Sequence, residues 1–456
     1  MTGGIATSPN LSRSAERAWH HIDAWVRQPA FPALLGMFGG SSQPVDERSV
    51  LGIMGQASRW SAGEDVSAVR ALPGRHGRIV AQLVALEEFA DFAWNFRQGV
   101  PRAVLHLLKS AHEGGAALAP MLPTLADRSR WFDQTSAAEL LEIYLGNGDD
   151  APVAEALREQ AISYPDLAGS GYRERWQAAD LPFGDGARRM VHAAADVLGL
   201  VTPGLPTGHY DHVVVLGGGG TSPWIRAHYA AELIEQHDLR PAHIWMLGSP
   251  RPVADGAERT LIERFVNSSA GAVSSRYLSA TSDEFDLMAV AAEAAFGVDA
   301  FGQENVCGCS SLSSPCPAWI ERIGAGPTTV EATNPHFQHQ RQRTYVTGAG
   351  PRVHVLSAST SRPPDRPNTA DTYELLSRQA HLRAGARLLI VTTQVFVPFQ
   401  KFDALRMLQL PHGVDVDVVG FGADRGDRPS TPEFELQEIL SGLRSARRLA
   451  AVLTNI

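Results

Sequence analysis

Downstream of Tyr210, short apolar runs rich in β-branched residues alternate with segments long enough to form helices, and this alternation constrains the fold more than any other feature. Parallel strands need long crossover connections, which are usually helices packed on the faces of the sheet. The alternation therefore predicts an α/β fold with a doubly wound, mostly parallel sheet. The expected strands are 212–217, 243–248, 352–358, 387–393 and 414–422, and the expected helices are 257–265, 284–295, 402–408 and segments beginning at Pro223, Thr369 and Pro432.

The sequence before this region follows a different pattern. From Ser12 to Leu200, apolar residues recur at three- and four-residue steps with turn residues between the segments, which is typical of amphipathic helices. Residues 201–211 are rich in proline and glycine. We therefore expect an all-helical domain over 1–200, a linker over 201–211 and the α/β domain over 212–456.

One segment of the α/β domain breaks the alternation. Residues 297–350 contain cysteine, proline, glycine, serine and threonine in place of a regular strand and helix. Structureless segments of this length are uncommon inside a compact domain. The segment is therefore expected to be a lid, a hairpin insertion or a functional loop.

Composition narrows the classes of partner. The chain has 456 residues, 44% of them hydrophobic, and a formal net charge of −9. No basic excess favours nucleic acid or an anionic membrane, so a small molecule is the expected partner, and a homo-oligomer is compatible with the sequence. The sequence shows no signal segment and no run of eighteen apolar residues, which makes the cytoplasm the expected location.

A run of four glycines follows the first expected strand of the α/β domain. Glycines let a backbone approach a ligand closely, and free amides at the start of a helix attract phosphate or carboxylate groups. Thr221 or Ser222 would cap that helix, with Pro223 in its first turn. The spacing departs from G-x-G-x-x-G, whose third glycine would fall on Ser222, and a tight turn that binds nothing is the alternative. The expected ligand-binding residues here are Gly217, Gly218, Gly219, Gly220, Thr221 and Ser222.

Several motifs in this half of the chain occur in the order of a known family. The segments are "VVVLGGG" with Arg226 downstream, "RPNTADTYELL" with Asn368 and Thr369, and "LLIVTTQVFVPFQKFDALRML". In these motifs, residues 211–422 resemble the YdcF/SanA/ElyC family of Rossmann-like domains. The resemblance implies a Rossmann-like sheet, an acidic residue after the second strand, and S-adenosylmethionine or a nucleotide as ligand. Phe396 and Phe399 stand where the family has a histidine and an arginine.

The candidate site combines these observations. In open parallel sheets, ligands bind beyond the carboxyl ends of the strands, where the strand order reverses. The expected role of Arg226 is to add charge, and Asn368 and Thr369 would orient the ligand. Further ligand-binding candidates are Thr392, Thr393 and Gln394, and the catalytic candidates are Glu258, Glu284 and Lys401.

The segment "RPPDRPNTADTY" leaves two interpretations open. Thr369 as the N-cap of a helix, with Asp371 in its first turn, accounts for part of the pattern without a function. Arg362 and Arg366 could instead clamp a carboxylate or phosphate.

Group transfer or hydrolysis of a small metabolite is the activity that these residues suggest. A non-catalytic ligand-binding or scaffold protein is the alternative, because two of the family's polar residues are absent.

The cysteines form a separate motif. Cys307, Cys309 and Cys316 lie close in sequence, and His336 and His339 follow downstream. Three cysteines and one histidine would satisfy tetrahedral zinc, but the spacing differs from the paired C-x₂-C of common zinc sites. We therefore assign no metal from sequence and interpret the cysteines as packing residues, with a zinc-stabilised interaction module and a reactive thiol as the alternatives.

Overall fold

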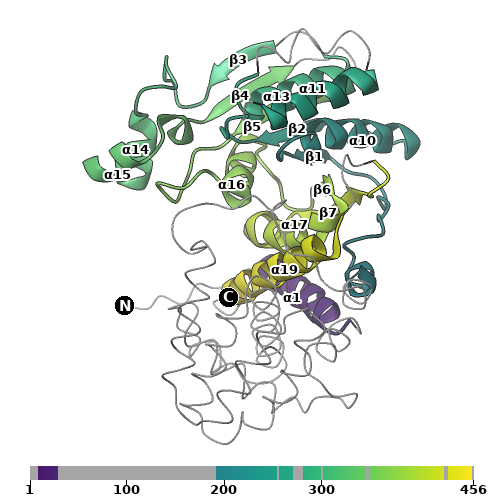
Figure 1. Ribbon diagram of the computed structural model, residues 1–456. Coiled ribbons are helices and arrows are strands. Elements are labelled where there is room, and N and C mark those ends of the chain that lie inside the picture. Colours follow the sequence, from purple (N-terminus) through teal and green to yellow (C-terminus); the bar gives the residue numbers. More distant parts are fainter. Residues whose placement is uncertain are drawn as a thin grey trace, which may run out of the picture. The chain divides into compact units, whose positions relative to one another are not determined.

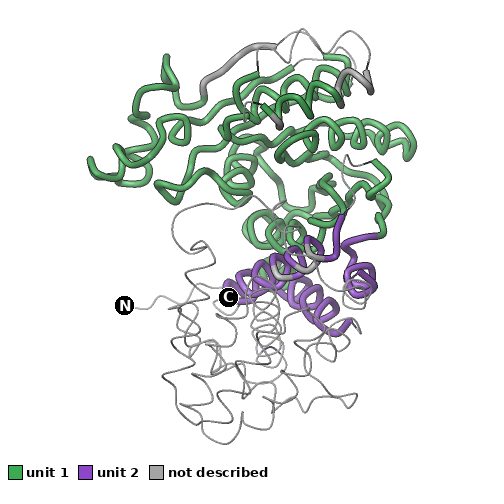
Figure 2. The backbone as a smooth tube through the Cα atoms, in the orientation of Figure 1, with its two compact units in different colours: residues 1–14, 202–429 green, residues 15–201, 430–456 purple. Residues whose placement is uncertain are grey.

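Figure 1 shows the protein as a computed structural model that describes residues 9–28, 76, 192–253, 256–270, 281–298, 301–345, 350–425 and 430–453. Contacts divide the chain into two compact units (Figure 2): unit 1 holds residues 1–14 and 202–429, and unit 2 holds 15–201 and 430–456. Unit 1 contains the strands expected from the sequence. The last helix, which the sequence analysis grouped with 212–456, falls in unit 2.

Unit 1 is built on one seven-stranded sheet of order β3-β4-β5-β2-β1-β6-β7. The run from β5 to β7 is parallel, whereas β4 is antiparallel to both β5 and β3. The prediction of an α/β fold with a mostly parallel sheet is therefore confirmed. The strands are β1 (His212–Leu216), β2 (His243–Gly248), β3 (Phe301–Asn305), β4 (Arg341–Tyr345), β5 (Arg352–Ser357), β6 (Arg387–Thr393) and β7 (Asp415–Phe421).

Helices cover both faces of this sheet. The helices α10 (Ser222–Gln236) and α13 (Glu284–Phe296) contact one face, while α16 (Thr369–Gln379) and α17 (Val397–Ala404) contact the other. Figure 1 shows the two sets on opposite sides of the strands. The remaining helices after β2 and β6 are α11 (Ala257–Ala270), η8 (Gln394–Phe396), η9 (Leu405–Gln409) and α18 (Leu410–His412).

Burial of both faces explains why the central strands are continuously apolar. All five residues of β1 are buried. Alternate residues point to opposite faces, so Val213 and Val215 join the core under α10 and α13, whereas Val214 and Leu216 join the core under α16. Each fully buried side chain of this size contributes about 1.5–3 kcal/mol to the hydrophobic stabilisation.

The segment 297–350 contains an antiparallel strand pair and short helices. Strands β3 and β4 pair with each other and extend the edge of the sheet beyond β5. This arrangement matches the hairpin-insertion alternative. Between the two strands lie α14 (Pro317–Ile323), α15 (Pro327–Ala332) and the short η7 (Pro335–Gln338).

Unit 2 holds most of α1 (Pro9–Val26) and all of α19 (Pro432–Leu453). The Trp25 indole donates to the Leu198 carbonyl over 3.1 Å, and Nδ1 of His192 lies 2.9 Å from Oε1 of Glu435. Most of the expected helical domain lies outside the described residues and stays a prediction. Within the described part of the chain, we find no helix with the length and apolar character needed to cross a bilayer.

Candidate functional site

The carboxyl ends of the parallel strands meet at one edge of the sheet, which brings together the loops singled out in the sequence. Strand β1 pairs with β2 on one side and with β6 on the other. The strand order therefore reverses between β1 and β6, the position where open α/β sheets bind ligands. The loops that follow these three strands form the candidate site.

The glycine turn after β1 is packed against its neighbours at its start. The amide of Gly217 donates to the Leu247 carbonyl over 2.6 Å. A Cβ atom at Gly217 would collide with this carbonyl and with the carboxylate of Glu284. Gly220 has a φ of +60°, which favours glycine. The turn thus requires glycine at Gly217 for space and at Gly220 for conformation.

A protein carboxylate occupies the place where the sequence suggested an anion. Oε1 of Glu258, on α11, accepts a hydrogen bond of 2.9 Å from the Gly220 amide. The same carboxylate pairs with Arg251 through two contacts of 2.7 and 3.1 Å. Glu258 therefore lies at the glycine turn, as an anion held by a backbone amide and an arginine.

Glu284 is the second acid at this edge and begins α13. It is buried, with 7% of its surface exposed, and its Oε2 accepts a 2.7 Å hydrogen bond from the Ser249 hydroxyl. Burial raises the pKa of Glu284, whereas Arg251, the Ser249 hydroxyl, Arg226 and Arg366 act in the opposite direction. A buried carboxyl with a raised pKa beside several arginines is suited to acid or base chemistry.

Arg226 is used to hold the turn in place. The side chain, 3% exposed, donates to the carbonyls of Leu216 and Gly217 and, over 3.0 and 3.2 Å, to the Thr393 hydroxyl. Its guanidinium also lies 5.6 Å from the centre of the Phe396 ring. Arg226 therefore ties the end of β1 to the end of β6, and the protein itself accepts these hydrogen bonds.

Two capping expectations need correction. Thr221 occupies the N-cap position of α10, yet its side chain makes no capping hydrogen bond. The N-cap of α16 is Asn368 and not Thr369: the Asn368 side chain accepts from the Asp371 amide over 3.4 Å, and the Asp371 side chain accepts from the Asn368 amide over 2.8 Å. These reciprocal bonds form a capping box, which is the physical reason that the helix begins directly after Asn368.

The remaining ligand-binding candidates lie at the end of β6. Thr392 is fully buried, and its hydroxyl has no hydrogen-bond partner among the described residues. Gln394 is also buried, and its backbone packs so closely on Gly420 that a Cβ atom there would collide with it. These residues flank the reversal point, next to Thr393.

Lys401 lies elsewhere. Its ammonium donates to the Val416 carbonyl and is 3.8 Å from Oδ1 of Asp417. Val416 pairs with Leu388 near the start of β6, so these contacts lie toward the amino end of the strands. Burial lowers the pKa of Lys401, opposed by Asp417 and Asp415. The structure therefore separates Lys401 from the glycine turn.

Arg251 and Arg341 were missed by the sequence analysis. Arg251 lies three residues after the end of β2, so its place near a strand end was the signal available. Arg341 binds Asp283 over 2.7 Å and Asp286 over 3.0 Å from the distant β4. These two ion pairs place a positive charge beside the acidic residues at the start of α13.

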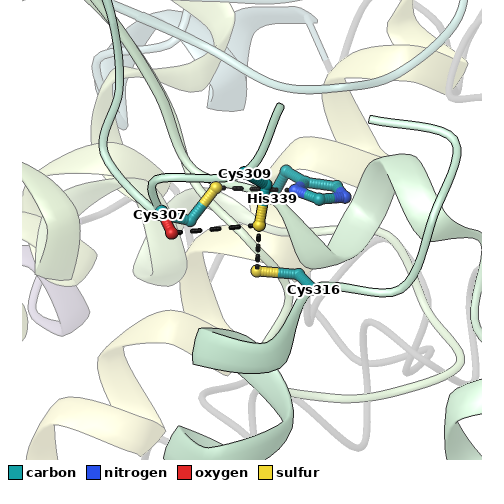
Figure 3. Close-up of side chains that lie close together, drawn as sticks. All are labelled: Cys307, Cys309, Cys316 and His339. Carbon is teal, nitrogen blue, oxygen red and sulfur yellow. Dashed lines mark hydrogen bonds between the residues drawn. The ribbon is translucent and has the colours of Figure 1, made fainter. Parts of the chain in front are cut away.

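A second cluster brings together the three cysteines and His339 in the insertion (Figure 3). Sγ of Cys307 lies 3.5 Å from Nδ1 of His339, and the sulfurs of Cys309 and Cys316 are 3.7 Å apart. All four ligand atoms lie within 4.8 Å of one another. The sequence suggests three cysteines with one histidine but leaves open whether His336 or His339 joins them. The structure brings His339 to the cysteines, which makes these four residues the metal-binding candidates in the described part of the chain.

Comparisons with known proteins find relatives of this chain in mycobacteria. No protein-family model and no solved structure match it. It is 30% identical over 308 residues to uncharacterized proteins of Mycobacterium bovis and of two strains of Mycobacterium tuberculosis, a match that covers 66% of this chain and 75% of each relative. The chain therefore belongs to the family of these uncharacterized mycobacterial proteins.

Proposed function

We propose that unit 1 is a Rossmann-like, doubly wound domain, similar to the YdcF/SanA/ElyC family, that binds a small anionic metabolite beyond the carboxyl ends of β1, β2 and β6. The ligand class is a metabolite bearing a carboxylate or phosphate, with S-adenosylmethionine and nucleotides as the first candidates. The proposed reaction class is group transfer or hydrolysis.

One observation carries the proposal: the Glu258 carboxylate is held by the Gly220 amide and by Arg251. Phosphate and carboxylate ligands are commonly bound by backbone amides at the start of a helix and by bidentate arginines. The Glu258 carboxylate has the same kinds of partner, so it resembles a bound ligand anion. A ligand anion would displace Glu258 and take over the Gly220 amide and Arg251. Glu258 then acts as an internal stand-in for the ligand.

Glu284 is the proposed acid or base. Burial raises its pKa although the nearby arginines act in the opposite direction, and a carboxyl with a raised pKa at a strand end is suited to proton transfer. Its carboxylate lies against Gly217, at the start of the turn that would hold the anion. Glu258 is the weaker candidate for this role because both of its oxygens contact Arg251.

A non-catalytic ligand-binding protein is the second candidate, and one observation favours it. Arg226 and Asn368, both expected to contact a ligand, donate to or accept from the protein's own backbone. When Arg226 and Asn368 are bonded to the backbone in this way, the domain could bind a ligand without catalysing a reaction. Turnover and binding therefore have to be measured separately.

The experiment is a thermal-shift screen of the full chain with S-adenosylmethionine, S-adenosylhomocysteine, nucleotides, sugar phosphates and inorganic phosphate. A true ligand at a hundredfold excess over its Kd should stabilise the folded state by about 2.7 kcal/mol. Arg251→Gln should abolish the shift. The matched control is Arg240→Gln, because Arg240 forms an exposed pair with Asp238 after α10.

The displacement step has its own variant. Glu258→Ala removes the competing carboxylate and should tighten binding of the ligand found in the screen. Weaker binding in Glu258→Ala would mean that Glu258 contacts the ligand, and no shift with any compound would contradict the proposed function. Glu284→Gln should keep the binding and lose turnover if the domain is an enzyme.

A further inference from the structure

The four residues Cys307, Cys309, Cys316 and His339 come from three separate segments of the insertion. The first two cysteines follow β3, Cys316 precedes α14, and His339 follows η7. We propose that these four side chains bind one structural zinc ion that holds the insertion together.

The distances fit this ion. Tetrahedral zinc with Zn–S bonds of about 2.3 Å and a Zn–N bond of about 2.0–2.1 Å places two sulfurs about 3.8 Å apart and a sulfur and a nitrogen about 3.6 Å apart. Cys309 and Cys316 have sulfurs 3.7 Å apart, and Cys307 and His339 have a sulfur-to-nitrogen distance of 3.5 Å. Both pairs therefore match the edges of a zinc tetrahedron.

The histidine is oriented as a ligand. Nε2 of His339 lies 2.8 Å from the carbonyl of Ser314, which can only accept a hydrogen bond. Nε2 therefore carries the proton, and Nδ1 presents its lone pair to the cysteines. A carbonyl on the far ring nitrogen is the usual partner of a zinc-bound histidine.

The backbone is shaped around the sulfurs. Gly308 has a φ of +71°, which turns the chain sharply between Cys307 and Cys309. The amide of Cys316 donates over 3.0 Å to the buried side chain of Gln338, next to His339. This bond links two of the turns that supply ligands.

A structural role follows from the ligand count. Four protein ligands close the coordination of zinc, whereas catalytic zinc keeps an open position. The elements between β3 and β4 are short, since α14 has 7 residues and α15 has 6. Short helices bury little apolar surface, so a metal ion supplies stability that a small core lacks.

The ion would also steady the edge of the sheet beside the candidate site. The indole of Trp319, on α14, donates to the Thr360 carbonyl over 2.7 Å, and Arg322 donates to the Ser359 hydroxyl over 2.7 Å. Ser359 and Thr360 belong to the loop that leads from β5 to α16. Zinc that fixes α14 therefore fixes the loop that carries Arg366.

A disulfide between Cys309 and Cys316 is the main alternative. Its sulfurs would have to approach to about 2.05 Å, far below the 3.7 Å separation, and Cys307 and His339 would be left without a role. Tetrahedral iron is the second alternative, since iron also accepts thiolate ligands. It would give a coloured protein.

The test begins with metal analysis of the full chain, purified under reducing conditions without chelator. About one zinc ion per chain is expected. Cys309→Ser should remove the zinc, and His339→Gln should lower zinc retention. The control is His336→Gln, which changes an exposed histidine three residues away on η7 and should leave the zinc content unchanged.

A second measurement tests the metal site in the wild-type protein, so the proposal can be decided even if the variants fail to fold. Wild-type protein stripped by a chelator is titrated with Co²⁺, which should give the visible and thiolate charge-transfer absorption of a tetrahedral sulfur-rich site, and Zn²⁺ should abolish it. Iron in place of zinc, a Cys309–Cys316 disulfide found by mass spectrometry, or metal-free protein that gives no cobalt absorption would each overturn the proposal.

Discussion

Arg226 on α10 donates two hydrogen bonds to the hydroxyl of Thr393, and these bonds join the helix after β1 to the end of β6. The same guanidinium donates to the carbonyls of Leu216 and Gly217. One buried side chain therefore connects the glycine turn after β1 with the end of β6, at the point where the strand order of the sheet reverses.

Replacing Arg226 by methionine should destabilise unit 1 by about 2–4 kcal/mol, because buried carbonyls and the Thr393 hydroxyl lose their donors. Urea denaturation of the two proteins measures the difference. The comparison variant is Arg240→Met, whose exposed ion pair should contribute less than about 0.5 kcal/mol. An effect of Arg226→Met as small as that of Arg240→Met would contradict the bridging role.

Arg341 provides a second test of buried charge. Its guanidinium binds Asp283 and Asp286 at the start of α13 and lies 4.0 Å from the centre of the Phe285 ring. Arg341→Met should cost about 3–5 kcal/mol, because two buried carboxylates lose their main counter-charge. The triple variant that adds Asp283→Asn and Asp286→Asn should recover stability relative to Arg341→Met, measured by urea denaturation. A further loss in the triple variant would show that the charges are not the cause.

The positions of β1, β2, β5, β6 and β7 follow from local hydrophobic patterns, which is why the sequence predicts them, whereas the more polar strands β3 and β4 within 297–350 were not predicted individually. The run at 212–217 is apolar because helices cover both faces of β1. The start of α13 at Glu284 is indicated by the residue before it, since Asp283 is a favoured N-cap residue. Hydrophobic patterns and capping residues can be identified from residues near in sequence. The parallel order of the central strands follows from the helix-length connections between them.

The partners of the site residues depend on contacts that no local pattern contains. Arg226 was expected to face a ligand, but its partner Thr393 is supplied by a strand 167 residues away. Lys401 follows β6 closely in sequence, yet α17 runs back along the sheet and carries it toward the amino end of β7. Proximity in sequence to a strand end was therefore a poor guide for a residue within the following helix.

The cysteine cluster shows the same limit. Spacing rules for zinc describe ligands that share one or two turns, whereas Cys316 and His339 are separated by α14, α15 and η7. The sequence supplied the ligand types but not the fold that gathers them.

Stability should fall with acid because of histidines buried at the amino end of the sheet. His354 stacks on Trp245 at 3.9 Å, and its Nε2 lies 3.1 Å from Nδ1 of His243. Burial, together with the smaller effects of His243, Arg352 and His212, lowers the pKa of His354 to about 4. Burial also lowers the pKa values of His212 and His243.

The free energy of unfolding should fall as the pH falls, because the unfolded chain binds a proton at His354 more readily than the folded protein does. The unfolded chain protonates His354 near pH 6.5, but the folded protein does so only near pH 4, so the folded state binds fewer protons between these values. The full contribution is present above about pH 6.5, and about 3 kcal/mol is lost by about pH 4. Urea denaturation across this range should show a shallower slope for His354→Gln than for the wild type. Parallel slopes would contradict the assignment to His354.

Substitutions at two glycines of the turn can distinguish its role in packing from its proposed role in ligand binding. Gly217 and Gly219 both lack a positive φ, so backbone strain does not distinguish them. A methyl group at Gly217 would collide with the Leu247 carbonyl and the Glu284 carboxylate, whereas one at Gly219 would meet Arg251 at 3.5 Å and Glu258 at 3.7 Å. Gly217→Ala should therefore lower the unfolding free energy by about 2–4 kcal/mol, while Gly219→Ala should change it by less than about 1 kcal/mol.

The Gly219→Ala variant, which should keep its stability, should nevertheless bind the ligand more weakly. The methyl group of Gly219→Ala would lie in van der Waals contact with Arg251 and with the Glu258 carboxylate that the ligand would replace, so it should obstruct a ligand that displaces Glu258. Isothermal titration calorimetry with the compound found in the thermal-shift screen should show weaker binding in this variant, although its urea midpoint stays close to the wild type. Undiminished binding in Gly219→Ala would mean that the ligand does not approach the turn at Arg251 and Glu258, and the anion site would then have to lie elsewhere along the carboxyl edge of the sheet.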